Sequence, residues 1–277
     1  MAASLTNVSQ FITGGFERVQ YALSSSGLPY GTAPSPDSGQ GMTIVEGAKA
    51  ANPTLGDAEV LQITGDNGVR GAIQFPSNSL PTFDLIFADL TAAFLNAVQG
   101  TTTDDAQSIY DFLLIDPEDA PVVDLFLMLT QKAVSTEAGS EGNGYFTVLF
   151  PLCTATLTGL PNMQTGANEG QFTWSVTVNR VSQLPWGESL SVASHGTTKA
   201  SGFVFFSEAI PTIDIFTQNG TTATYTPTQT LNSNDQVIAW NDIAGTTGTL
   251  SITPSTGDFT FTAGTSGEVT LFLYEVA

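Results

Sequence analysis

The stretch 122-VVDLFLMLT-130 decides the expected architecture, together with the run 145-YFTVLFPLCTATL-157 that follows a GSEGNG turn. Both runs are nearly continuous in apolar residues, so a strand formed from either is expected to be buried on both faces. We therefore predict an antiparallel pair with one side against another layer or another subunit. The candidate core or subunit-interface positions are Leu125, Phe126, Leu127, Met128, Phe146, Val148 and Phe150.

Further strands are predicted on both sides of this pair. Alternation of apolar and polar residues marks Gln171–Val181 (QFTWSVTVNRV) as a strand with one packed face and one face toward water. Upstream, strands over Glu59–Thr64 and Val69–Phe75 flank a GDNG sequence at Gly65–Gly68. Asn-Gly between two strand-like runs is typical of a β-hairpin.

One segment follows helical spacing instead. Between Pro81 and Gln99 the apolar residues recur at intervals of four, three, four and four, at Phe83, Phe87, Leu90, Phe94 and Val98. Pro81 suits a first helical position and Gly100 suits a C-terminal cap. This pattern predicts one amphipathic helix over 81–99, packed against a sheet by a core-facing stripe rather than forming a ligand box.

The composition changes near Ser191–Ser201, and we place a domain boundary there. The prediction is a main domain over 1–195, a β-sandwich or partial barrel, with a long loop or arm at 24–58. A small Ig-like or jelly-roll-like β-sandwich over 202–277 follows. Its predicted strands are Thr212–Thr217, Thr221–Thr226, Gln236–Trp240, Thr249–Thr253, Asp258–Thr262 and Glu268–Tyr274.

The charge balance excludes a surface that grips nucleic acid. The chain of 277 residues has 26 acidic and 6 basic residues, a formal net charge of -20. Phosphate binding needs clustered cations, and these six are scattered, which also disfavours an anionic membrane surface. Nevertheless, 41% hydrophobic residues supply a core, so the chain is expected to fold. The basic residues are Arg18, Lys49, Arg70, Lys132, Arg180 and Lys199.

An insertion at 101–121 concentrates negative charge without any basic residue. A solvated loop is the favoured interpretation; calcium ligation is a minor alternative because no EF-hand spacing is present, and a repulsive surface is the third. We name its acidic residues as candidates for a tube lumen or an inter-ring surface. They are Asp104, Asp105, Asp111, Asp116, Glu118 and Asp119.

The residues needed for catalysis, metal binding or redox chemistry are sparse. The single histidine, His195, falls in the predicted linker, and one His makes neither HExxH nor a zinc cluster. Asp116 and Asp119 resemble a glycosidase pair only by chance, and both nucleotide-binding glycine motifs are absent. The single Cys153 is expected to be a small buried residue without a disulfide partner. We expect no enzyme activity, no metal and no cofactor.

The opening residues and the apolar runs bear on location. MAASLTNVSQFITGG lacks the basic and apolar regions of a secretory signal, and no apolar run approaches the ~18 residues of a membrane helix. A protein made and assembled inside a cell is expected.

The order of elements over about two thirds of the chain resembles the major tail tube protein of long-tailed bacteriophages. The resemblance rests on pattern and order and not on a signature motif, and the acidic insertion has no counterpart in it. The carrying segments are the hairpin at GDNG, FPSNSLPTFDLIFADLTAAFLNAVQG, VVDLFLMLTQKAV, YFTVLFPLCTATLTGLP and QFTWSVTVNRVSQLPWG.

The resemblance implies a structural virion protein. Such proteins form stacked, normally hexameric rings through which DNA passes without specific binding, so an anionic wall would suit the role. It further implies contacts with tape measure and terminator proteins, assembly in the host bacterial cytoplasm, a place in the virion tail, and no membrane. The last 75 residues look like β domains displayed on the outside of such tails.

Two alternatives remain open on the sequence. A capsid decoration or fibre protein would share the composition and the lack of catalytic chemistry. A glycan-binding module would use exposed aromatic residues as stacking platforms, for which Trp186, Trp240 and Tyr30 are the candidates, although aromatic residues more often fill cores.

Overall fold

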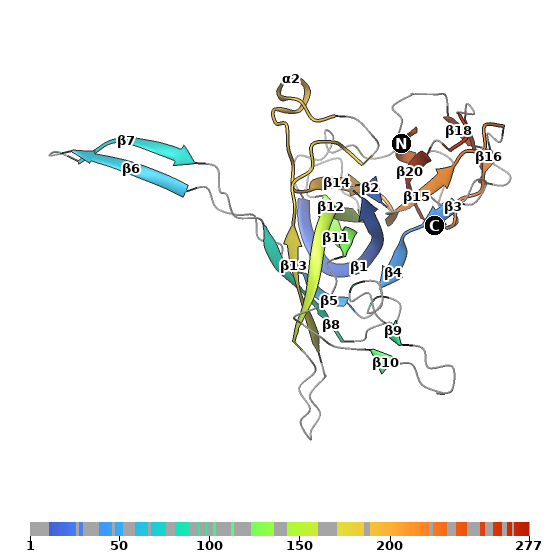
Figure 1. Cartoon of the computed structure of the whole chain (residues 1–277), viewed down its shortest axis with the longest axis horizontal. Helices are drawn as coiled ribbons and strands as arrows, with labels where there is room; N and C mark the ends of the chain where they lie inside the picture. Colours follow the sequence, from blue (N-terminus) through green and yellow to red (C-terminus); the bar gives the residue numbers. More distant parts are fainter. Residues whose placement is uncertain are drawn as a thin grey trace.

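The protein is mainly β, as predicted, and its strands form a barrel-like sheet, two smaller sheets beside it and two separate hairpins (Figure 1). The computed structural model describes residues 11–25, 28–29, 39–45, 48–51, 59–65, 68–75, 81–88, 94, 98, 102–103, 112–113, 123–135, 143–159, 171–185, 189–221, 224–231, 237–242, 250–252, 257–261, 265–267 and 269–276.

The large sheet curls until its two ends almost meet. Its antiparallel strands follow the order β1 (Phe11–Ser25), β11 (Asp124–Ser135), β12 (Asn143–Gly159), β13 (Phe172–Val178), β8 (Thr82–Phe87) and β5 (Ala48–Ala51). β4 (Thr43–Val45) pairs with the opposite edge of β1, and only residues 46–47 separate β4 from β5. The result is a nearly closed barrel, consistent with the predicted partial barrel, and β2 (Leu28–Pro29) pairs antiparallel with Ser24 and Ser25 at the end of β1.

Apolar side chains fill the barrel. Inward positions alternate along each strand, so β13 buries Trp174, Val176 and Val178 as its sequence predicts. Phe94 is fully buried and packs edge-on against Trp174, with ring centroids 5.5 Å apart. A small barrel closed around such residues is a packed core and not a channel.

The helix predicted over 81–99 is wrong in its first half. Thr82–Phe87 is strand β8, paired with β13, and its burial alternates so that Phe83, Leu85 and Phe87 face inward. Phe83 and Phe87 are four residues apart, a spacing that fits the alternation of a strand as well as one face of a helix. Because this segment pairs with two neighbouring strands, β13 and β5, it is a strand. Of the second half, the structure describes Phe94 and Val98, both helical and buried.

The long loop predicted at 24–58 contains short strands. Besides β2, β4 and β5, β3 (Gly39–Gly41) lies in this segment. These strands have two to four residues each, too short to show alternation among Gly, Ser and Pro. These short strands are held in place by pairing with longer strands, and the sequence did not indicate this pairing.

The C-terminal residues form two stacked sheets, here called the C-terminal unit, and all six predicted strands are confirmed. One sheet has the order β17 (Val237–Asp242), β20 (Val269–Glu275), β15 (Pro211–Thr217) and β3; the other has β16 (Thr224–Tyr225), β19 (Phe259–Phe261) and β18 (Leu250–Ile252). β15 is buried along its whole length because it lies between the barrel wall and the second sheet.

The barrel and the C-terminal unit share an apolar core. Phe126, Met128 and Leu149 on the outer barrel face pack in one cluster with Ile213 and Leu271 of the C-terminal unit. In addition, β14 (Phe203–Ser207) pairs with residues 145–149 of β12, whereas residues 153–159 of β12 pair with β13. The predicted boundary between 195 and 202 is therefore crossed by strand pairing and by packing.

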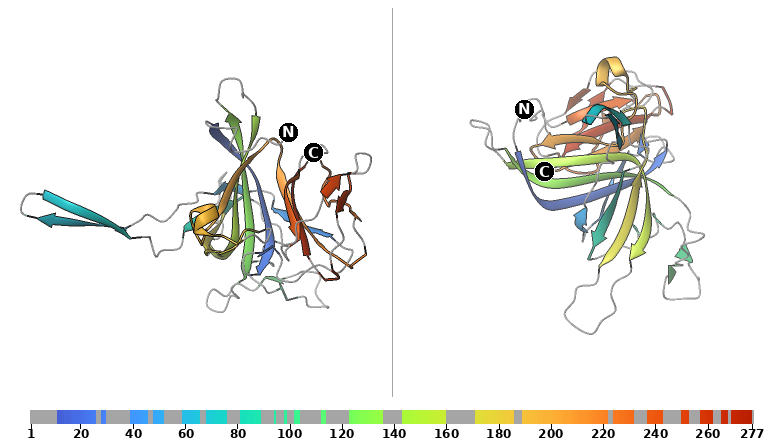
Figure 2. Two further views of the ribbon diagram at one scale, coloured as in Figure 1. Left: turned by 90° about the horizontal axis from the view of Figure 1, so that it is seen from above. Right: turned by 90° about the vertical axis from the view of Figure 1, so that its left-hand side faces the viewer.

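The predicted hairpin around GDNG is confirmed and projects from the body (Figure 1; Figure 2, left). β6 (Glu59–Gly65) and β7 (Gly68–Phe75) are antiparallel, with Gly65 opposite Gly68. A second, small hairpin joins β9 (Thr102–Thr103) to β10 (Phe112–Leu113), and a short helix α2 (Val192–His195) lies at the top of Figure 1.

Candidate functional site

The residues considered for catalysis do not come together in the part of the chain that the structure describes. His195 ends the one-turn helix α2, whose start is capped by Ser191 Oγ, which accepts from the Ser194 amide at 3.2 Å. No group of three potential metal ligands occurs among the described residues. Asp116 and Asp119 lie outside them.

The six acidic candidates of the 101–121 insertion also lie outside the described residues. The flanking strands are described: Phe112 of β10 pairs with Thr103 of β9. Assignment of these acids to a lumen or an inter-ring surface stays a prediction.

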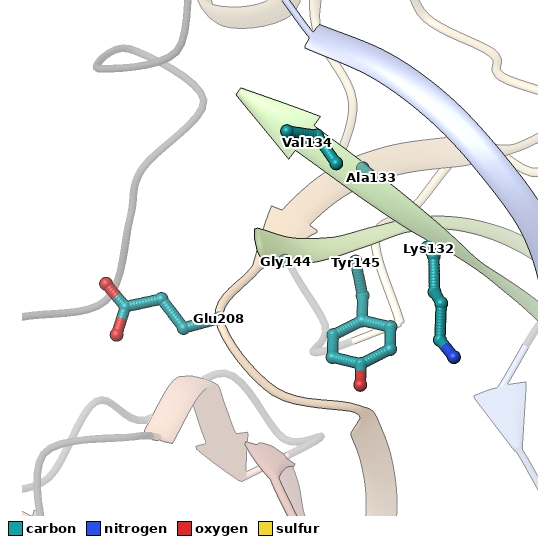
Figure 3. Close-up of a pocket in the computed structure, with 6 residues that line it drawn as sticks. All are labelled: Lys132, Ala133, Val134, Gly144, Tyr145 and Glu208. Carbon is teal, nitrogen blue, oxygen red and sulfur yellow. The ribbon is translucent and has the colours of Figure 1, made fainter. Parts of the chain in front are cut away.

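An open hollow of about 360 Å³ lies where β11 and β12 approach the start of the C-terminal unit (Figure 3). Its lining includes Lys132, Tyr145 and Glu208. Lys132 and Tyr145 project side by side from adjacent strands, whereas the Glu208 carboxylate points away from both (Figure 3). The Lys132 ammonium lies 3.1 Å from the Glu17 carboxylate, and the Lys132 side chain is 62% exposed, so the two form a solvated surface ion pair. These groups do not form a nucleophile and base pair.

Asp214 on β15 is fully buried and accepts four hydrogen bonds from described residues. Its Oδ2 accepts from the hydroxyls of Tyr225 at 3.0 Å and Tyr274 at 2.9 Å and from the Thr228 amide at 2.7 Å. Its Oδ1 accepts from Thr228 Oγ1 at 2.6 Å. Burial raises the pKa of this carboxyl, and the bonds from Thr228 and the two tyrosines oppose the rise. We call these four residues the Asp214 cluster.

The sequence did not single out Asp214, although a signal was present. The residue stands between Ile213 and Ile215 in a run predicted as a strand, where a charged residue is unusual unless it has partners. Because its oxygens are occupied and sealed from solvent, the cluster is suited to holding strands together and not to turnover.

Glu275, at the end of β20, is a second buried carboxyl with fewer partners. Its Oε1 accepts from the Glu208 amide at 2.8 Å, while Oε2 has no hydrogen-bond partner among the described residues. Burial raises the pKa of Glu275 as well. It is fully enclosed in the chain and offers no oxygen to a ligand from solvent.

The predicted core or interface residues lie inside a single chain. Leu125, Leu127 and Phe150 point into the barrel, and Phe126 and Met128 face the C-terminal unit. All five are at most 2% exposed, and Phe146 and Val148 are partly buried against the same sheet. The apolar character of both faces of β11 is therefore explained by another layer of the same chain.

The projecting hairpin is the feature best placed for contact with another molecule. β6 and β7 pair only with each other in the described structure, so each has an outer edge of unpaired backbone groups. By register, Leu61 lies opposite Ile73 and Glu59 lies opposite Phe75, and Ile63 and Gly71 form the next pair of the same alternate series. The intervening pairs are Val60 with Gln74 and Gln62 with Ala72.

Such a hairpin is incomplete in isolation. A lone two-stranded ribbon is marginally stable in water and gains stability when an apolar face packs on another surface. Sequence reasoning identified the hairpin but not its isolation from the body.

No protein-family model matches the chain, and no curated protein matches it significantly. Among the described residues there is no helix of the length and apolar character needed to cross a membrane.

Proposed function

We propose that this chain is a structural protein that assembles with copies of itself. The observation that carries the proposal is the projecting hairpin, whose two strands pair only with each other among the described residues and which has Leu61, Ile63, Ile73 and Phe75 at alternate positions of its register. A second copy of this chain is the favoured binding partner of the hairpin, because any neighbour in a homo-oligomer presents the same unpaired edges and the same barrel surface.

The form of assembly that we propose is the stacked ring of a phage tail tube. Support comes from the mainly β barrel and from the resemblance in element order. Support also comes from the charge of -20, which suits a wall that DNA passes without binding. On this proposal the partners are further copies, a tape measure protein and a terminator protein, and the location is the virion tail.

The hairpin can be tested with two single substitutions that add the same charge. Ile73→Asp places a carboxylate at one of the alternate apolar positions, and Gln74→Asp places one at the adjacent polar position of the same strand. Burying one large aliphatic side chain contributes about 1.5–3 kcal/mol, which a carboxylate there would remove. Ile73→Asp should abolish the large species seen by analytical ultracentrifugation, while Gln74→Asp should assemble like the unaltered chain.

Circular dichroism of both variants serves as the fold control, because the hairpin lies outside the barrel. Equal assembly of the two variants would contradict a role for the alternate apolar positions of the hairpin. Assembly into compact trimers would instead favour a capsid decoration protein. Binding of a glycan array would favour the glycan-binding alternative.

A further inference from the structure

One short segment belongs to both halves of the molecule. β3 pairs with β15 of the C-terminal unit, with Gly41 opposite Asp214, and β4 pairs with β1 of the barrel, with Ile44 opposite Gln20. Only Met42 separates the two strands. We call residues 39–45 the strap; in Figure 1, β3 lies near the C-terminal strands and β4 lies nearer the barrel.

The strap is tightly seated at its centre. The Met42 amide donates to the Ile213 carbonyl at 3.1 Å, and the Met42 side chain is buried in the core shared by the barrel and the C-terminal unit. The strap is therefore held by backbone pairing on both sides of Met42 and by burial of the Met42 side chain itself.

Gly41 lies directly over the Asp214 cluster. A Cβ atom added at Gly41 would overlap Thr228 Oγ1 and would lie 2.8 Å from Asp214 Oδ1. Any side chain at position 41 would thus displace the strap or break the 2.6 Å bond between Thr228 and Asp214. The absence of a side chain here is a packing requirement and not a demand on the backbone angle.

The cluster under Gly41 ties the two sheets of the C-terminal unit to each other. Asp214 and Tyr274 come from one sheet and Tyr225 from the other, and Thr228 follows Tyr225 in the chain. The Tyr274 hydroxyl also accepts from the Gln229 amide at 3.1 Å. A buried carboxylate with four donors is costly to leave partly unsatisfied, so the cluster forms as a whole.

We propose that the strap is an intramolecular latch. Seating of Gly41 closes the Asp214 cluster, and the C-terminal unit keeps its packed form only while the strap is held by the barrel. The latch operates within one chain and does not depend on self-assembly.

A second polar contact supports the coupling of the two halves. Gln20, fully buried on β1, donates through Nε2 to the Pro211 carbonyl at 2.7 Å and accepts from Thr212 Oγ1 at 2.7 Å. Since Ile44 of the strap pairs with Gln20, the strap and the first residues of β15 are fixed to the same barrel strand.

The test compares Gly41→Ala with Gly15→Ala. An added Cβ at Gly15, also in a strand of the barrel sheet, meets nothing within 4 Å. Hydrogen exchange of the full chain is measured by mass spectrometry over 211–217 and 269–275 and over the barrel strands. Gly41→Ala should raise exchange in the C-terminal segments by at least roughly tenfold and leave β11 and β12 much less affected. Gly15→Ala should leave both unchanged.

A double-mutant cycle identifies the contact itself. Thr228→Ala removes the oxygen that the new Cβ would overlap, so Gly41→Ala should accelerate exchange by a smaller factor in that background than in the unaltered chain. If Gly41→Ala accelerates exchange by the same factor with and without Thr228→Ala, the proposed closure of the strap over Thr228 is overturned. Unchanged C-terminal exchange in Gly41→Ala alone would overturn the latch. If Gly41→Ala fails to fold, recovery of folded protein by the double variant supports the latch, and its failure overturns it.

Discussion

At the residue scale, Asp214 and Glu275 are buried with very different numbers of partners. Four hydrogen bonds from neutral donors surround Asp214, whereas Glu275 has an oxygen without a partner among the described atoms. Burial raises the pKa of both carboxyl groups. Asp214 is therefore fixed by its bonds, while Glu275 is a residue whose charge weakens the fold.

Glu275→Gln should reduce the loss of stability with rising pH. The folded state holds the Glu275 proton more tightly than the unfolded state, because its pKa is raised on folding. The stability that the protonated Glu275 carboxyl contributes is fully present below its pKa in the unfolded chain, about 4.3. This stability is lost as the pH rises through the higher pKa of the folded state. In chemical denaturation from pH 4 to 7, the free energy of unfolding of the variant should therefore increase relative to that of the unaltered chain as the pH rises.

The control is Asp84→Asn, which removes one carboxylate from an exposed position of β8. Because both variants lose one carboxylate, the general repulsion among acidic groups changes equally in both, and only Glu275→Gln should gain stability relative to this control as the pH rises. Parallel curves for Glu275→Gln and Asp84→Asn would contradict the destabilising role of the Glu275 charge.

At the element scale, β11 joins the two cores of the molecule. Leu127 faces the barrel interior and Met128 faces the C-terminal unit, and both are fully buried. An element packed on both faces within one chain should contribute to stability from both faces without help from a second copy.

Leu127→Ala and Met128→Ala should each lower the free energy of unfolding by about 2–5 kcal/mol through lost burial and cavity formation. Urea denaturation at two protein concentrations measures this. Asp124→Ala, at an exposed position of the same strand, should change stability by no more than about 0.5 kcal/mol. If the loss of unfolding free energy in Met128→Ala increased with protein concentration, this face of β11 would pack on another copy.

Long elements were predictable from the sequence because their patterns are local. The apolar runs of β11 and β12 and the alternation in β13 show their burial directly. β8 was mistaken for a helix because Phe83 and Phe87 fit both periods, and the inward position of Leu85 depends on its neighbours. β3 has the sequence GQG, so only its pairing with β15, far away in the chain, makes it a strand. The Asp214 cluster was missed for the same reason.

At the scale of the whole molecule, the net charge of -20 opposes association of like copies. On the proposed function, the hairpin and its unpaired strand edges favour association, so the balance between association and repulsion depends on ionic strength. Screening shortens the range of repulsion from about 10 Å at 0.1 M salt to about 3 Å at 1 M.

Raising the sodium chloride concentration from 0.1 to 1 M should therefore shift the protein toward its assembled form, as measured by sedimentation velocity. Ile73→Asp at the same concentrations is the control and should stay unassembled. Dissociation of the assembly by salt would contradict this balance, because it would indicate contacts dominated by opposite charges.

Electron microscopy of the concentrated, purified chain tests self-assembly most directly. The proposed function predicts hollow rings, or tubes of stacked rings, with the projecting hairpin of each copy against a neighbouring copy. Compact single particles of one chain at every concentration and salt level would contradict it.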